Sequence, residues 1–158
     1  MKHLIQTELY TMCCIVKDGY VLLLNRPAER GFPGYLGPGG KVEFPESASE
    51  AAIREVYEET GLHVTQLQFK GIDGYADPKN NYRYIVYNYI ATEFEGTLLE
   101  NPTEGDLHWV RIEDALQLPM QDWFRRRFPL FFEEGTFEIH EEWDDAKQLM
   151  EHTRIHHL

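Results

Sequence analysis

Residues 40–62 read GKVEFPESASEAAIREVYEETGL, and they predict a helix from Ser47 to Thr60. Ser47 is a candidate N-cap because Glu50 follows it by three residues, which is the spacing of a capping box. An apolar stripe that can pack against a core recurs every four residues, at Ala48, Ala52 and Val56. Gly61 is expected to end the helix, because glycine readily adopts the left-handed conformation that closes helices.

Three glutamates, Glu55, Glu58 and Glu59, lie on one face of this helix, since residues three and four apart are neighbours. Like charges about 4 Å apart repel by about 4 kcal/mol at an effective dielectric constant near 20, so the cluster favours a bound cation. Hard carboxylate oxygens suit Mg²⁺, which also bridges to substrate phosphates. Just upstream, Gly39 and Gly40 allow the backbone to approach the same place closely.

The same spacing is also found on solvated helix faces. In that interpretation Arg54 is an ordinary helix-face partner of Glu50 or Glu58. The positions of the glutamates leave both alternatives open.

Upstream of this stretch, the sequence predicts a hairpin followed by a long loop. Thr11–Val16 and Tyr20–Leu24 are apolar runs on either side of Lys17-Asp18-Gly19, a turn signal. The segment 26–40 contains five glycines and three prolines, and we expect it to be a loop. A loop of this length in a compact domain is usually functional.

Downstream, several further elements are expected. The predicted strands are Val64–Lys70, Tyr82–Ala91, Gly96–Leu99, His108–Arg111 and Thr136–His140. Glu113–Leu118 is expected to be a short helix, and a second helix is expected to start near Phe128, with Pro129 in its first turn. Residues 141–158 are expected to form a peripheral, partly helical tail whose histidines lie in a frayed end. This order predicts an α+β fold with a mixed sheet covered on both faces, in one domain over residues 1–158.

The acidic composition excludes some classes of binding partner. With 15 Lys and Arg against 27 Asp and Glu, the net charge is −12, so we expect neither nucleic acid nor an anionic membrane as a partner. The basic run Arg125-Arg126-Arg127 is interpreted as a solvated face, and the adjacent Cys13 and Cys14 as packing on opposite faces of a strand. The first ten residues contain no signal-peptide core and no apolar run approaches a membrane span, so the expected location is cytoplasmic.

The same stretch resembles the signature of the Nudix hydrolases, G-x5-E-x7-R-E-U-x-E-E-x-G-U, where U is a bulky aliphatic residue. Every position is met, by Gly40, Glu46, Arg54, Glu55, Val56, Glu58, Glu59, Gly61 and Leu62. The resemblance implies an α/β/α sandwich around a mixed sheet. It also implies hydrolysis of a nucleoside diphosphate linked to another group, with Mg²⁺ as cofactor and Mn²⁺ as an alternative ion.

The resemblance further implies a role for each signature residue. Glu55, Glu58 and Glu59 would bind the metal with the carbonyl of Gly39, and one of them, or a metal-bound hydroxide, would activate water. Arg54 would orient a glutamate, and Glu46 would support this arrangement without touching the metal.

Much of the chain is similar to the MutT-like 8-oxo-dGTP diphosphatases. The matching segments are Tyr10-Thr11, Arg30-Gly31-Phe32, residues 39–42, Glu104 with Trp109, and Phe128-Pro129-Leu130. By this resemblance the substrate would be 8-oxo-dGTP or a related purine nucleotide. Glu104 would be an additional metal ligand, and Thr11 would line the base pocket, although Glu104 also fits an ordinary turn carboxylate and Thr11 an ordinary strand residue.

The remaining expected substrate contacts surround the glycine-rich segment. Arg26 and Lys41 are candidates for the phosphates, beside the backbone of Gly39 and Gly40. Leu36 stands where such enzymes often place a base-reading asparagine, while Asp122 and Trp123 are candidates for an acceptor and a stacking surface. Alternative substrates are ADP-ribose, a nucleotide sugar or a dinucleotide polyphosphate, and a non-catalytic nucleotide sensor is a third alternative. The expected partner is a small nucleotide, bound by a monomer or a homodimer.

Overall fold

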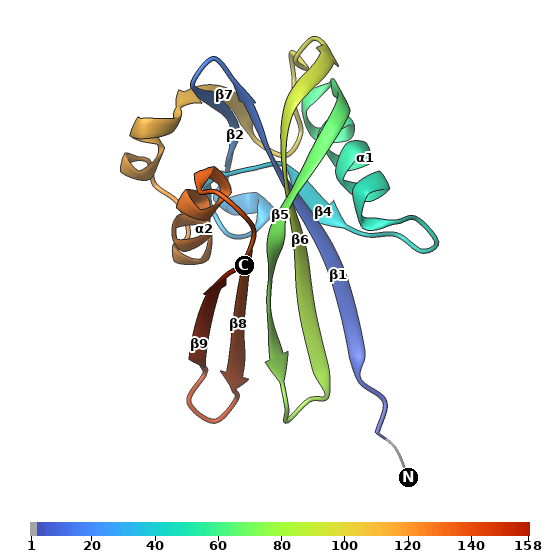
Figure 1. Cartoon of the computed structure of the whole chain (residues 1–158), viewed down its shortest axis with the longest axis vertical. Coiled ribbons are helices and arrows are strands. Elements are labelled where there is room, and N and C mark those ends of the chain that lie inside the picture. Colours follow the sequence, from blue (N-terminus) through green and yellow to red (C-terminus); the bar gives the residue numbers. More distant parts are fainter. Residues whose placement is uncertain (1–2) are drawn as a thin grey trace.

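The computed structural model describes residues 3–158, and its nine strands form one mixed sheet in the order β3-β2-β1-β6-β5-β8-β9 (Figure 1). β4 also pairs with β1, and β7 pairs with β2. The strands are β1 (Gln6–Lys17), β2 (Tyr20–Arg26), β3 (Gly34–Leu36), β4 (Gly39–Lys41), β5 (Leu62–Asp77), β6 (Tyr82–Gly96), β7 (Asp106–Arg111), β8 (Phe137–Asp144) and β9 (Leu149–His157). The helices are α1 (Ala48–Thr60) and α2 (Asp122–Arg127), with 3₁₀ turns at Ala28–Arg30, Ile112–Gln117 and Phe128–Phe132.

Helices cover both faces of the sheet, so the predicted α/β/α arrangement is confirmed. On one face α1 buries Ala52 and Val56 in a core cluster that includes Cys13 from β1. On the other face α2 and the following 3₁₀ turn bury three phenylalanines in a cluster that includes Cys14. The two cysteines are free, buried and on opposite faces, as their adjacency in a strand predicts.

The predicted N-cap of α1 is confirmed. The Ser47 hydroxyl accepts a hydrogen bond from the Glu50 N–H at 3.2 Å, and the Glu50 carboxylate accepts one from the Ser47 N–H at 3.2 Å. At the other end Gly61 has φ = 84°, a left-handed conformation that costs glycine little. These two signals fix where the helix begins and ends, and therefore which face carries its glutamates.

Replacing Ser47 by Ala is expected to lower the free energy of unfolding by about 1 kcal/mol, because the N-terminal amides of α1 lose their side-chain acceptor. Urea unfolding monitored by circular dichroism measures the change. Ser49→Ala is the matched control, because Ser49 lies in the same exposed turn but does not cap the helix. Equal losses in both variants would contradict the capping role.

Several predicted element boundaries are wrong. The expected loop between Arg26 and Gly40 contains the short strands β3 and β4, which pair with β2 and β1. The strand predicted at Gly96–Leu99 does not form, since β6 ends at Gly96. β5 and β6 are also much longer than predicted, because they pair with each other along almost their whole length. Pairing partners distant in the sequence extend these strands beyond the local pattern.

The C-terminal third differs most from expectation. A helix does begin at Phe128 with Pro129 in its first turn, as predicted, but it is a 3₁₀ helix, and α2, which precedes it from Asp122, was not expected. The tail is not helical or frayed: β8 joins β5 in parallel, and β9 pairs antiparallel with β8 up to His157. The arginine run is not a solvated face either, because Arg127 is only 3% exposed.

The upper part of the sheet lies between the helices, while β1, β5, β6, β8 and β9 extend beyond them (Figure 1). Within residues 3–158, no helix has the length and apolar character needed to cross a membrane.

Candidate functional site

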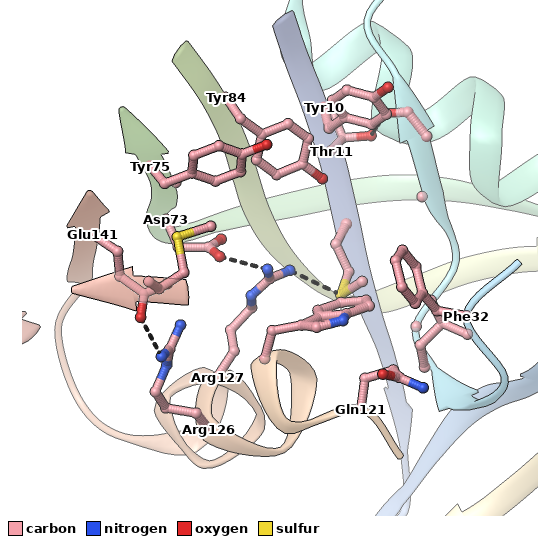
Figure 2. Close-up of a pocket in the computed structure, with 18 of the residues that line it drawn as sticks. Tyr10, Thr11, Phe32, Asp73, Tyr75, Tyr84, Gln121, Arg126, Arg127 and Glu141 are labelled. Carbon is pink, nitrogen blue, oxygen red and sulfur yellow. Dashed lines mark hydrogen bonds and ion pairs between the residues drawn. The ribbon is translucent and has the colours of Figure 1, made fainter. Parts of the chain in front are cut away.

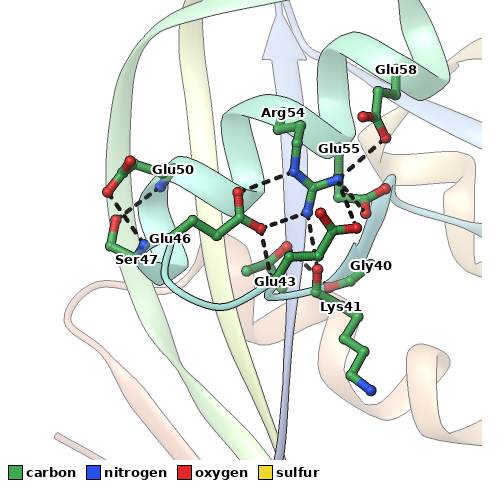
Figure 3. Close-up of polar contacts among 10 residues, drawn as sticks. Gly40, Lys41, Glu43, Glu46, Ser47, Glu50, Arg54, Glu55 and Glu58 are labelled. Atoms are coloured by element: carbon green, nitrogen blue, oxygen red, sulfur yellow. Dashed lines mark hydrogen bonds and ion pairs between the residues drawn. The ribbon is translucent and has the colours of Figure 1, made fainter.

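Arg54 organises the acidic face of α1 (Figure 3). Its guanidinium donates two hydrogen bonds to Glu46, from Nε at 3.1 Å and from Nη2 at 2.6 Å. Nη1 donates to Glu55 Oε1 at 3.0 Å and to Glu58 Oε2 at 3.3 Å, and Nη2 also reaches the Lys41 carbonyl at 3.0 Å. Hydrogen bonding to Arg54 lowers the pKa of Glu46 below its usual value. Arg54 therefore ties the carboxylates of α1 to β4.

The glycine pair of β4 lies directly against two of these carboxylates. The Gly39 N–H donates to Glu59 Oε2 at 2.8 Å. A Cβ atom on Gly40 would lie 2.4 Å from Glu55 Oε1 and would displace that carboxylate, and a Cβ on Gly39 would lie 2.0 Å from the Thr11 carbonyl oxygen, so only glycine fits at position 39. β4 is held there by its antiparallel pairing with β1, in which Gly40 lies opposite Thr11.

The surroundings of Glu59 disfavour its ionised form. Burial raises the pKa of Glu59 to about 8, and repulsion from Glu55 and Glu104 adds to this, while the Gly39 N–H and Arg26 act in the opposite direction. Burial likewise raises the pKa of Glu55. Glu104, from the segment before β7, therefore belongs to the same electrostatic cluster as the α1 glutamates. This crowding of carboxylates is what a cation would relieve.

The donor set fits a hard divalent ion. Carboxylate oxygens and a backbone carbonyl are the kind of oxygen ligands that Mg²⁺ prefers, and the glycine backbone of β4 lies close to the Glu55 carboxylate. Among residues 3–158 no three acidic or histidine side chains converge on one metal position in the present arrangement, in which Arg54 draws Glu55 and Glu58 toward itself. Glu58 is exposed and can turn toward an ion by giving up its hydrogen bond to Arg54.

A pocket of about 570 Å³ adjoins the carboxylates on the other side of Gly39 and Gly40. Three tyrosines form one side (Figure 2): Tyr75 stacks on Tyr84 with ring centroids 5.4 Å apart, and Tyr10 follows at 4.9 Å from Tyr84. Phe32 and Trp123 add aromatic surface elsewhere in the lining. A volume and an aromatic lining of this kind suit a planar heterocycle.

The pocket also has a polar part, which the sequence analysis missed. It contains two ion pairs, between Arg127 and Asp73 and between Arg126 and Glu141, the second with an Nη1–Oε1 distance of 2.7 Å (Figure 2). No local pattern indicated this pairing, because Asp73 and Arg127 lie 54 residues apart in the sequence.

The structure brings together most of the predicted substrate contacts. Lining the pocket are Thr11, Arg26, Leu36, Gly39, Gly40 and Trp123. Thr11 and Leu36 are buried, and the Thr11 hydroxyl lies 3.5 Å from the Gly40 carbonyl oxygen. Lys41 and Asp122 are exposed and do not line the pocket, and the Lys41 side chain points away from Arg54 (Figure 3). The arrangement can therefore hold a ring in the pocket with its phosphates beside α1.

Comparison with known proteins agrees with this geometry. The NUDIX domain family model matches residues 8–131. The chain is similar to the CTP pyrophosphohydrolase of Escherichia coli strain K12, with 32% identity over 107 residues, covering 67% of this chain and 77% of that protein. It is also similar to the oxidized purine nucleoside triphosphate hydrolase of Mus musculus, with 26% identity over 153 residues, covering 93% of this chain and 94% of that protein.

Solved structures show the same fold. The MutT protein of Bacillus halodurans superposes with a TM-score of 0.79 at 29% identity, covering 94% of this chain and 97% of that one.

Proposed function

Since this chain belongs to the Nudix family and is a hydrolase of the MutT type, we propose that its substrate is an oxidised purine nucleoside triphosphate such as 8-oxo-dGTP. The products would be the nucleoside monophosphate and pyrophosphate. Members of this family need a divalent metal ion, typically Mg²⁺, and we propose Mg²⁺ here.

The main support for the proposal is that Gly39 and Gly40 line the aromatic pocket and also lie against Glu59 and Glu55. A purine in the pocket therefore has its polyphosphate directed past the glycine backbone toward the carboxylates. The similarity over 93% of the chain to a hydrolase of oxidised purine nucleotides supports the choice of base.

Different residues of the chain bind the base, the phosphates and the metal ion in this proposal. Tyr75, Tyr84 and Trp123 hold the base by stacking, and Arg26 contacts the phosphates from the end of β2. Glu55, Glu58 and Glu59, with Glu104 and the Gly39 carbonyl, would hold the metal ion. When bound, the ion would neutralise phosphate oxygens and lower the pKa of a coordinated water. Arg54 keeps Glu55 in place, and an ionised carboxylate of this set accepts the proton of the attacking water.

A substrate panel tests this function. With Mg²⁺, purified protein is expected to convert 8-oxo-dGTP to the monophosphate and pyrophosphate with a higher kcat/KM than CTP, ADP-ribose, a nucleotide sugar or a dinucleotide polyphosphate. Chromatography of the products distinguishes pyrophosphate from single phosphate release. If CTP or ADP-ribose were the best substrate, the family assignment would stand and the proposed base would be wrong.

A further inference from the structure

The ion pair between Arg127 and Asp73 lies deep in the pocket and is held in one geometry. The two side chains are 4% and 8% exposed. Asn88, from β6, fixes both: its Nδ2 donates to Asp73 Oδ1 at 2.9 Å, and its Oδ1 accepts from Arg127 Nη1 at 3.3 Å. Asn88 is itself fully buried and does not line the pocket, whereas Arg127 and Asp73 do.

Part of the hydrogen-bonding capacity of this pair is unused. Arg127 Nε is buried and has no hydrogen-bond partner among residues 3–158. An unpaired buried donor is costly, and a buried ion pair is often no more stable than apolar side chains of similar volume. Stability alone therefore does not account for charged groups in the lining of this pocket, whereas hydrogen bonding to a polar ligand in the pocket does.

We infer that Asp73 and Arg127 read the edge of the substrate's base, and that they select a ring N–H next to a carbonyl. This rests on the proposed function, because it requires the base to occupy the pocket. The Asp73 carboxylate accepts the ring N–H, and the Arg127 guanidinium donates to the carbonyl oxygen. Both hydrogen bonds are charge-assisted and so favour the strongly polarised N–H and C=O of a lactam over the amino group and ring nitrogen of an amidine.

The structures of the bases predict which nucleoside triphosphates this pair of residues would accept. 8-Oxoguanine carries a lactam-type edge on both rings, guanine and hypoxanthine carry one on the six-membered ring, and adenine carries none. Since a site built to hydrogen-bond a polar edge rejects a base that leaves it unpaired, 8-oxo-dGTP, dGTP and dITP should all be hydrolysed in preference to dATP.

A comparison of dITP with dATP tests recognition of the base edge alone, because the two bases have the same ring size and differ only at position 6 and in the N1 proton. For the wild-type protein with Mg²⁺ we expect kcat/KM for dITP to exceed that for dATP at least about tenfold. In Asp73→Asn and in Arg127→Lys that ratio should fall toward 1. Asp145→Asn is the matched control, since it makes the same chemical change in an ion pair with Lys79, neither of which lines the pocket, and it should keep the wild-type ratio.

Thermal melts establish whether each variant is folded. If a variant is unfolded, the wild-type ratio of kcat/KM for dITP to kcat/KM for dATP still tests the inference. A wild-type ratio near 1, or folded Asp73 and Arg127 variants that keep the wild-type ratio, would overturn this inference and leave the proposed function intact. If the wild-type protein hydrolyses none of the purine triphosphates, the proposed function fails and the inference fails with it.

Discussion

Glu59→Gln is expected to lower kcat by about 10³-fold while the protein remains folded. A bound metal ion contributes several kcal/mol to the transition state, and each 1.36 kcal/mol corresponds to a tenfold change in rate. Glutamine removes the charge that would hold the ion, but its side-chain oxygen can still accept the hydrogen bond from the Gly39 N–H. Steady-state hydrolysis of 8-oxo-dGTP with saturating Mg²⁺ measures the effect.

The melting temperature of the metal-free Glu59→Gln protein should equal or exceed that of the wild type, because burial and the charges of Glu55 and Glu104 make ionisation of Glu59 unfavourable in the folded protein, and glutamine does not ionise. Glu93→Gln, an exposed position on β6, is the matched control and should change neither rate nor stability. A Glu59→Gln enzyme within a few-fold of the wild-type rate would remove Glu59 from the proposed metal site.

Arg54→Met is expected to lower kcat/KM by about 10- to 100-fold, the usual range for a residue that orients metal ligands from outside the coordination sphere. Unlike Glu59→Gln, it should also lower the melting temperature, because Glu46, Glu55 and Glu58 lose their shared cation. Thermal unfolding and steady-state kinetics on the same preparation separate the two effects.

Arg54→Lys tests the geometry apart from the charge. Lysine keeps the positive charge but cannot donate the paired Nε and Nη2 hydrogen bonds that Arg54 gives to Glu46. We therefore expect an intermediate loss of activity. Full activity in Arg54→Lys would mean that charge alone suffices and that Arg54 does not position Glu55.

The parts of the fold that depend on local signals were predictable. The capping box at Ser47, the left-handed Gly61 and the alternation of Cys13 and Cys14 are all properties of a few consecutive residues. The lengths of β5 and β6 and the existence of β9 were not, because they depend on pairing with strands far away in the sequence. The tail after residue 141 looked polar because β9 is an edge strand, and its side chains are largely exposed.

The α1 carboxylates and the polar part of the pocket likewise differed in how far the sequence predicted them. The carboxylates of α1 lie within five residues of one another, so helical geometry alone places them together. The polar part of the pocket joins Asp73 on β5 to Arg127 on α2, and no local pattern relates them. A run of three arginines is normally solvated, and only the packing of α2 against the sheet shows that Arg127 turns inward while Arg125 and Arg126 stay partly exposed.

In the proposed function, the carboxylates of α1 hold a divalent ion against the phosphates of a nucleotide. Electron paramagnetic resonance of Mn²⁺, titrated into the metal-free protein with a non-hydrolysable purine triphosphate analogue, tests it directly. We expect a bound Mn²⁺ signal that saturates for the wild-type protein and is strongly weakened in Glu59→Gln. Equal Mn²⁺ binding by the two proteins would contradict it.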